Sequence, residues 1–267
     1  MDKTDSKVIV VTSGKGGVGK TTATANIGAY LSKIGKKVVL IDTDIGLRNL
    51  DISLGLENNI VYDLVDVLKG ACDISRAIIK DKRFEGLYFI PAAQMCDKDA
   101  VSEEQMEKLC LRLKNDFDFV IIDCPAGIEQ GFKNAIAGAK TAIVVTTPEI
   151  SALRDADRVI GLLEESSIEE MYLLINRIMP DMIKKGDMLN IDDVIERLGI
   201  NLIGIVPYDE SVIALANKGE LIVNYTKSKA GQGYKNIAKR LCGQDVLLMD
   251  LDEGGFFKRI KKFFKSK

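Results

Sequence analysis

The sequence predicts an α/β fold, a doubly wound and mostly parallel β-sheet flanked by helices. Short, uninterrupted runs of β-branched and apolar residues recur along the chain, and stretches with helical periodicity separate most of them. A strand that is apolar without alternation is buried on both faces, as in a parallel sheet, and alternating strands and helices imply right-handed crossovers. Four of the five prolines (Pro91, Pro125, Pro148 and Pro207) fall at or just past the end of such a run, where the chain leaves the sheet.

The first apolar run begins at Val8, breaks into glycines and leads into a helical stretch over residues 22–34, which Gly35 is placed to end. Later runs predict strands at residues 37–42, 87–91, 119–123, 142–146, 171–176 and 202–207. Further helices are predicted at residues 103–115, 130–139, 151–165, 191–198 and 232–242. Because no polar low-complexity linker divides the middle of the chain, we expect one large domain over residues 1–243.

The composition excludes several kinds of chemistry. The 267 residues include no histidine and no tryptophan, so a Ser-His-Asp triad, a Cys-His pair and a His-ligated metal are all excluded. The five cysteines are odd in number and scattered, without C-x-x-C spacing, and no signal peptide precedes the first strand. We therefore expect a reduced, cytoplasmic protein in which carboxylates, lysines and hydroxyls carry the chemistry.

A glycine-rich loop joins the first strand to the first helix. Its residues fit the pattern G-x-x-x-x-G-K-[ST], in which backbone N–H groups converge on phosphate oxygens, a lysine reaches the β and γ phosphates and a hydroxyl binds Mg²⁺. The N-terminus of the following helix adds partial positive charge. An ordinary tight turn is the alternative, but the full pattern between a strand and a helix favours an ATP and Mg²⁺ site. The residues are Gly14, Lys15, Gly16, Gly17, Val18, Gly19, Lys20, Thr21 and Thr22.

Polar residues follow the strands at the edge where ligands bind in doubly wound sheets. They are Asp42, Asp44, Asp123, Asn176 and Asp209. Asp123 ends a strand and precedes a proline-glycine turn, which suits a magnesium ligand, although such a residue taken singly is more often a helix cap or turn former. Asp42 and Asp44 form D-x-D, so one carboxylate is expected to support the Mg²⁺ shell and the other to orient the attacking water.

Lys15 is not required by an ordinary phosphate loop, and from the pattern alone a solvated loop charge is as good an explanation. However, the text K-G-G-V-G-K-T resembles the signature of the MinD/ParA family of deviant Walker A ATPases, to which the nitrogenase iron protein also belongs. Further similarity runs through Asp42–Asp51, D-C-P-A-G-I-E, T-P-E and Lys185–Met188 and covers essentially the whole chain. Within the family, the sequence is most similar to the septum site-determining branch, which positions the bacterial division site.

The resemblance implies roles for particular residues. Lys15 would reach across a nucleotide-sandwich dimer to the partner's phosphates, Lys20 would bind phosphate and Asp44 would help to place the water, which makes these three the expected catalytic residues. Thr21, with Asp42 and Asp123, would bind Mg²⁺. Asn49 would lie in the first switch segment, and residues 123–127 would form the second. Asn176, Arg177, Pro207 and Asp209 match positions that frame the adenine.

The end of the chain forms a separate element. Residues 256–267 hold six of the 37 basic residues and no acidic one, which leaves 31 basic against 39 acidic residues upstream. The pattern predicts an amphipathic helix with an apolar stripe opposite its basic residues, preceded by a flexible linker over residues 244–255. A helix docked on the core is the alternative, but aromatic residues opposite lysines suit an anionic membrane surface. The expected membrane residues are Phe256, Phe257, Lys258, Arg259, Ile260, Lys261, Lys262, Phe263 and Phe264.

These features together predict an ATPase that dimerises when ATP is bound and attaches to the cytoplasmic face of the cell membrane. The resemblance implies a MinC-type division inhibitor as a partner, and a MinE-type or substitute topological factor; no specific nucleic acid is expected. Two alternatives remain open. A ParA-like ATPase would bind DNA through basic patches. An iron–sulfur carrier would bind its cluster through Cys96 and Cys124, although the simpler interpretation of these two cysteines is that they are small, partly buried thiols.

Overall fold

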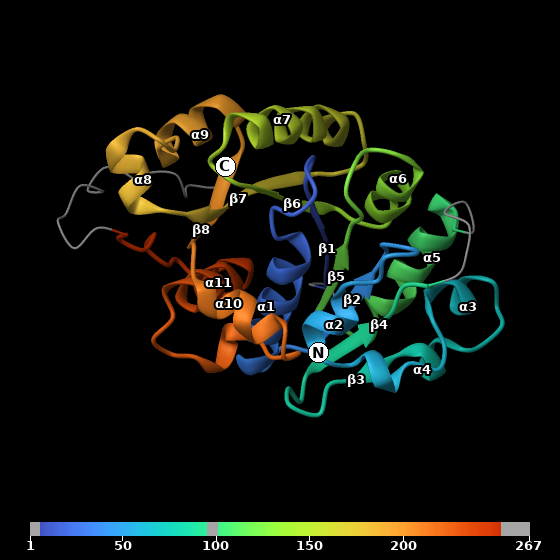
Figure 1. Cartoon of the computed structure of the whole chain (residues 1–267). Helices are drawn as coiled ribbons and strands as arrows, with labels where there is room; N and C mark the ends of the chain where they lie inside the picture. Colours follow the sequence, from blue (N-terminus) through green and yellow to red (C-terminus); the bar gives the residue numbers. More distant parts are fainter. Residues whose placement is uncertain (1–5, 95–100, 252–267) are drawn as a thin grey trace.

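The computed structural model describes residues 6–94 and 101–251, which form a single eight-stranded sheet in the order β3-β4-β2-β5-β1-β6-β7-β8 (Figure 1). Every neighbouring pair is parallel except β3 with β4. This confirms the predicted doubly wound, mostly parallel sheet. The strands are β1 (Lys7–Thr12), β2 (Val38–Asp42), β3 (Ile79–Lys80), β4 (Leu87–Ile90), β5 (Phe119–Asp123), β6 (Thr141–Thr146), β7 (Glu170–Ile178) and β8 (Asn201–Pro207).

Helices cover both faces of the sheet (Figure 1). Residues of α5, α6, α7 and α9 pack on one face, and residues of α1, α2 and α11 pack on the other. The helices are α1 (Lys20–Lys33), α2 (Leu50–Leu54), α3 (Leu64–Leu68), α4 (Ile74–Ala77), α5 (Glu103–Leu113), α6 (Gln130–Ala137), α7 (Ile150–Glu164), α8 (Pro180–Lys185), α9 (Ile191–Leu198), α10 (Glu210–Ala216) and α11 (Lys229–Leu241), with short 3₁₀ turns at Glu57–Asn59 and Ile222–Asn224.

The central strands are buried on both faces, as their continuous apolar sequences predict. In β1, Val8 and Val10 point into one core and Ile9 and Val11 into the other, and all four are at most 4% exposed. Since successive side chains of a strand point to opposite faces, a strand between two helical layers needs apolar residues at every position. The carboxyl ends of these strands carry the polar residues of the site.

The short elements are those that the periodicity did not predict. Helices α2, α3, α4, α8 and α10 have four to seven residues, too few to show a period of 3.6 residues. Local signals mark some of them: Asp63 forms a capping box with Asp66 at the start of α3, and Pro180 begins α8. Strand β3 has two residues and pairs antiparallel to β4 at the edge of the sheet, so no alternation could reveal it.

Residues 244–251 follow α11 without helix or strand but are held against the domain. The Arg240 guanidinium donates to the carbonyl oxygens of Val246 and Leu247 at 2.8 and 3.0 Å and to that of Ile203 on β8 at 2.7 Å. Leu251 is buried in the core on the α7 side of the sheet. The remainder of the predicted linker, residues 252–255, and the predicted membrane helix lie outside the described residues. Within the described ranges, no helix is long and apolar enough to cross a membrane.

Candidate nucleotide and magnesium site

The loop between β1 and α1 takes backbone conformations and close contacts that its glycines allow. Gly17 and Gly19 have φ angles of +78° and +100°, in the left-handed region that favours glycine. At Gly14 the reason is packing, because a Cβ atom there would lie 2.0 Å from the carbonyl oxygen of Asp155 on α7. The loop is therefore pressed against α7 at one end and turns sharply at the other.

Lys20 is the first residue of α1 and is 8% exposed. Its ammonium donates to the hydroxyl of Ser13 at 2.9 Å, and that hydroxyl donates in turn to the carbonyl oxygen of Lys15 at 2.8 Å. The Lys20 side chain, which starts at the end of the loop, therefore reaches Ser13 at the beginning of the loop. Ser13 was not among the predicted site residues; its place directly after β1 is the only sequence signal for it.

Lys15 is directed to its own chain. Its ammonium lies 3.0 Å from the hydroxyl of Ser151 and 3.4 Å from a carboxylate oxygen of Glu149, both at the start of α7. The side chains of Lys15 and Glu149 are 40% and 55% exposed, and an exposed ion pair of this length contributes at most about 1 kcal/mol. The contact therefore positions the Lys15 side chain, and breaking it costs little free energy.

Asp42 and Asp123 lie side by side as register partners at the ends of β2 and β5. Both are almost fully buried. The Asp42 carboxylate accepts hydrogen bonds from the backbone N–H groups of Asp44 at 2.9 Å and Leu50 at 3.1 Å. Burial, followed by the neighbouring charge of Asp123, raises the pKa of Asp42 well above its usual range. The first aspartate of the D-x-D motif therefore lies beside Asp123 at the candidate metal site, and its carboxylate ties the next loop to that site.

Asp123 is held from the side of α1. Thr24 donates its hydroxyl to a carboxylate oxygen of Asp123 at 3.2 Å, and the Thr21 hydroxyl also bonds this carboxylate. Burial raises the pKa of Asp123, while the hydrogen bond from Thr21 and the positive charge of Lys20 lower it. Thr24 is one helical turn beyond the recognised motif, and only the structure identifies it.

The donor set fits a magnesium ion. Two desolvated carboxylates and a hydroxyl are hard oxygen ligands, and Mg²⁺ typically takes one or two carboxylates and completes its shell with phosphate oxygens and water. A bound cation would also relieve the repulsion between the two buried carboxylates. Within the described residues no group of three or more His, Cys, Asp or Glu side chains could hold a metal.

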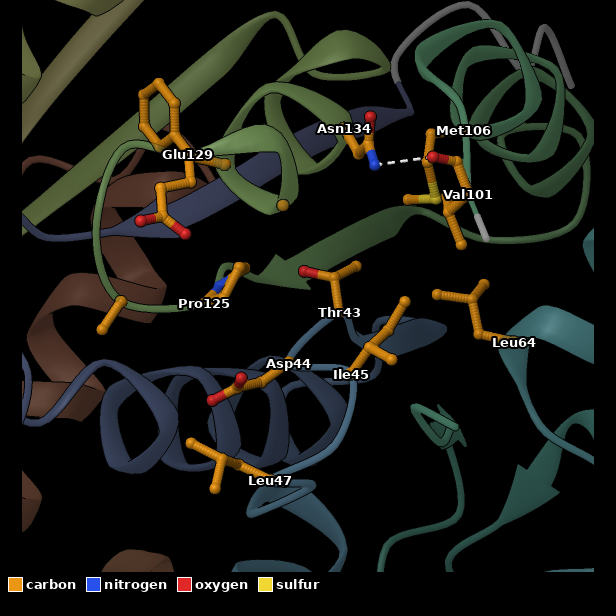
Figure 2. A pocket seen from close by; sticks show the side chains of 13 residues that line it. Thr43, Asp44, Ile45, Leu47, Leu64, Val101, Met106, Pro125, Glu129 and Asn134 are labelled. Atoms are coloured by element: carbon orange, nitrogen blue, oxygen red, sulfur yellow. Dashed lines mark hydrogen bonds between the residues drawn. The ribbon is translucent and has the colours of Figure 1, made fainter. Parts of the chain in front are cut away.

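Two loops follow the metal-site strands and enclose a cavity of about 120 Å³ (Figure 2). Asp44 from the loop after β2 and Glu129 from the loop after β5 lie on one side of it, and Val101, Met106 and Leu64 lie on the other. The loop after β5 also reaches the phosphate loop, because a Cβ on Gly16 would lie 3.8 Å from Ala126. The predicted second switch, residues 123–127, is therefore next to the phosphate loop. The predicted first-switch residue Asn49 is exposed at the start of α2.

The four residues predicted to frame the adenine line one cavity of about 200 Å³ next to the phosphate loop, which we call the base-side cavity. Asn176 fixes the loop by donating its amide N–H to the carbonyl oxygen of Val18 at 2.8 Å. Arg177 is exposed and has a φ of +56° beside a bulge of β7. Helix α10 supplies a wall that the sequence did not predict. Its lining residues are Val212, Ile213 and Ala216, and the cavity is also lined by Gly19, Thr22, Asn176, Arg177, Pro207, Tyr208, Asp209, Asn217 and Tyr234.

Asp209 lies at the rim of this cavity but its carboxylate bonds within the protein. It caps α10 by accepting from the Ser211 N–H at 2.9 Å and accepts from the Ser228 hydroxyl at 2.6 Å. Partial burial raises the pKa of Asp209, but the hydrogen bonds from Ser228 and Ser211 outweigh it, so the net shift is downward. Asp209 therefore positions α10 and the start of α11 around the cavity.

The cysteines that the structure describes do not resemble a cluster-binding set. Cys124 is buried directly after Asp123, and burial raises the pKa of its thiol to about 12. A thiol that is protonated at neutral pH and shielded from solvent is a poor ligand for a cluster shared with a second chain. Cys96, the other residue of the iron–sulfur alternative, lies outside the described residues.

Comparison with known proteins supplies the family. Residues 6–175 match a family model described as an AAA domain. The chain is 56% identical over 262 residues to the septum site-determining protein MinD of Bacillus subtilis (strain 168), which covers 97% of this chain and 98% of that protein. The chain belongs to the MinD family. The resemblance that its phosphate loop indicates is thereby confirmed, and with it a place among the MinD/ParA ATPases.

Solved MinD structures share this fold. One from the MinC:MinD cell division protein complex of Aquifex aeolicus is 46% identical, covers 92% of this chain and 99% of that one, and superposes with a TM-score of 0.86. The septum site-determining protein MinD of Pyrococcus horikoshii OT3, solved with Mg-ADP, is 29% identical with a TM-score of 0.81 and covers 88% of this chain and 96% of that one. Septum site determination is thus the function of the relatives, and a magnesium nucleotide is a ligand of one of them.

Proposed function

We propose that the protein is an ATP-dependent membrane switch that helps to position the division site. The observation that carries the proposal is the assembly at one edge of the sheet. There, Lys20 lies at the end of the phosphate loop, Asp42 and Asp123 stand in register, and the base-side cavity adjoins the loop at Gly19. In this proposal Lys20 binds the phosphates, the two aspartates and Thr21 hold Mg²⁺, and Asp44 orients the water. The metal supplies charge neutralisation of the phosphates when it is bound.

Dimerisation completes the proposed site. Lys15 leaves Ser151 and Glu149 of its own chain and reaches the phosphates of the nucleotide in the partner. Two exposed contacts are broken, and a charge-assisted contact to phosphate replaces them. ATP binding therefore favours the dimer, and hydrolysis, which removes the γ phosphate, favours separation.

The C-terminal segment gives dimerisation its effect. Each basic residue near an anionic membrane surface contributes about 1 kcal/mol, and each large apolar side chain that is buried contributes about 1.5–3 kcal/mol before the cost of ordering the helix. One tail then binds reversibly, whereas two tails on one dimer gain about 10²–10⁴-fold in avidity. The protein would exchange between the cytoplasm and the cytoplasmic face of the cell membrane.

The membrane-bound dimer would recruit a MinC-type division inhibitor, as the MinC:MinD complex of the Aquifex relative suggests. Residues 151–158 of α7 offer a docking helix next to Lys15, and Ile150 at its start is an exposed large apolar residue. A MinE-type or substitute factor would trigger hydrolysis and release. Specific recognition of nucleic acid is not part of the proposal.

Liposome sedimentation tests this function. The full chain is mixed with anionic vesicles in the presence of MgATP or MgADP, alongside a variant that lacks residues 256–267. We expect sedimentation with MgATP, little with MgADP and none for the truncated chain. Equal sedimentation with both nucleotides, or ATP-dependent binding without the tail, would contradict the switch. A steeply salt-dependent affinity for DNA without lipid binding would favour a ParA-like role instead.

A further inference from the structure

Arg83 joins two elements that lie far apart in the sequence. Its guanidinium donates to the carbonyl oxygen of Gly219, just after α10, at 2.6 Å, and to that of Leu54, the last residue of α2. The same group donates to both carboxylate oxygens of Asp81, at 3.1 and 2.7 Å. One planar guanidinium therefore binds the Asp81 carboxylate and the carbonyl oxygens at two helix ends at the same time. Arginine can make this set of hydrogen bonds, and lysine cannot.

Asp81 fixes this guanidinium to the sheet. It is 1% exposed and also accepts from the backbone N–H of Arg83 at 2.7 Å. Its own N–H donates to the carbonyl oxygen of Leu87 on β4 at 3.0 Å. Because the arginine is anchored to a strand, the carbonyl oxygens that it binds are held in fixed positions relative to the sheet.

The two helix ends are also in direct contact, and Figure 1 shows α2 and α10 side by side. Gly55 and Gly219 have φ angles of +63° and +65°, and a Cβ on Gly219 would lie 2.6 Å from the Cα of Gly55. Backbone packs on backbone here, so one helix end cannot move toward the other. Arg83 prevents the opposite movement by holding both carbonyl oxygens.

The two helices reach the two halves of the candidate nucleotide site, α2 by its first residue and α10 by residues along its length. Helix α2 has five residues, and the N–H of its first, Leu50, donates to the metal-site carboxylate of Asp42. Helix α10 lines the base-side cavity with Val212, Ile213 and Ala216. A continuous set of contacts thus runs from the base-side cavity through Arg83 to Asp42.

We propose that Arg83 is a positioning residue that couples occupation of the base-side cavity to the placement of α2, and through α2 to Asp42. The inference rests on the proposed nucleotide site. A base in the cavity orders α10 and Gly219, and Arg83 transmits this order to Leu54. A ligand that fills only the phosphate loop lacks this effect on α2.

Hydrogen exchange measured by mass spectrometry tests the coupling in the full chain. The amides of residues 50–55 are followed without ligand, with MgADP and with magnesium tripolyphosphate, which has no base. In the wild type we expect MgADP to slow their exchange about fivefold or more relative to tripolyphosphate. In Arg83→Lys, which keeps a positive charge beside Asp81 but loses the fork, we expect the two ligands to protect α2 equally.

Arg112→Lys is the matched control. Arg112 also forms an ion pair with an aspartate, Asp73, at 2.7 Å, and within the described part of the chain it donates to neither α2 nor α10. This variant should keep the wild-type difference between the ligands. Wild-type-like base-dependent protection in Arg83→Lys would overturn the coupling, as would equal protection of wild-type α2 by both ligands while MgADP still binds. Failure of MgADP to bind the wild type would instead overturn the proposed function, and the coupling with it.

Discussion

At the scale of single residues, the site is defined by charges that are expensive to bury. Asp42 and Asp123 are desolvated next to one another, and their pKa values are raised because ionised carboxylates lose hydration and repel each other there. The protein has no histidine, so ordinary histidine titration does not mask the behaviour of these carboxyl groups between pH 5 and 8. The pair therefore has a measurable pH signature.

We predict that the metal-free protein loses stability relative to Asp42→Asn as pH rises. The unfolded carboxyl has a pKa near 3.8 and the folded one a higher pKa, so the folded state binds more protons between these values. The loss of folding free energy caused by ionising Asp42 in the folded state is absent below the pKa that Asp42 has in the unfolded state. It grows with pH until the pH passes the pKa of Asp42 in the folded state. Urea unfolding of both proteins in EDTA across pH 4–9 measures it. A difference in unfolding free energy that does not change with pH would contradict the assignment.

The loop glycines give a second prediction at this scale. Gly14→Ala places a Cβ 2.0 Å from a backbone oxygen of α7, and a backbone atom cannot move away as a side chain would. Gly16→Ala places a Cβ at an ordinary contact distance of 3.8 Å from Ala126. We expect Gly14→Ala to lower the unfolding free energy by about 1–3 kcal/mol and Gly16→Ala to change it by much less. Urea unfolding without nucleotide compares them. Equal losses would show that packing against α7 is not what requires Gly14.

At the scale of elements, short segments that the periodicity did not reveal surround the site. Helix α2 connects to Asp42, α10 lines the base-side cavity, and residues 244–251 are tied to α11 and β8 through Arg240. Each is held by contacts with residues outside the segment rather than by helix propensity. Such segments are where local opening is easiest to change by mutation.

We predict that Arg240→Ala releases residues 244–251 from the domain. The variant loses the donors to Ile203, Val246 and Leu247, so thermolysin should cleave near Leu247 several-fold faster than in the wild type. Lys239→Ala, on the neighbouring position of α11, is the control and should cleave at the wild-type rate. Unchanged cleavage in Arg240→Ala would mean that the burial of Leu251 alone holds the segment.

At the scale of the whole molecule, the phosphate loop of one chain is proposed to complete the site of another. The Lys15 side chain is 40% exposed and its contacts to α7 are weak. The basic tail and the acidic body, with 31 basic against 39 acidic residues upstream of residue 256, give the chain two differently charged parts. In the proposed dimer, Lys15 would contact the partner and the basic tail would contact the membrane.

We predict that Lys15→Ala binds MgATP but remains monomeric. The variant keeps Lys20, Thr21 and the aspartates of its own site, and loses the one cation that would cross to the partner. Light scattering after gel filtration in MgATP measures the mass, and fluorescent-nucleotide titration measures binding. Lys82→Ala, an exposed lysine in the β3–β4 loop, is the control. An ATP-dependent dimer of Lys15→Ala would contradict the proposed role of Lys15.

The sequence alone determined the sheet, the phosphate loop and the family. Apolar runs such as Phe119–Asp123 and the spacing from Gly14 to Thr21 are local patterns, and they correctly placed every described strand except β3, together with the prolines and the polar residues at the strand ends. The family resemblance placed Asn176 and Pro207 in one set, and the structure brings both to one cavity. The strands and the phosphate loop depend on residues near one another in the chain.

Only the tertiary structure decided which side chains meet. Lys15 bonds a residue 136 positions away, Arg83 binds the carbonyl of Gly219 at the same separation, and Thr24 reaches Asp123 across 99 positions. No local pattern encodes such contacts, because they depend on how the crossovers bring α1, α7 and α10 to one edge of the sheet. The sequence therefore determined which residues are candidates for nucleotide binding, and the fold decided what holds those residues in place.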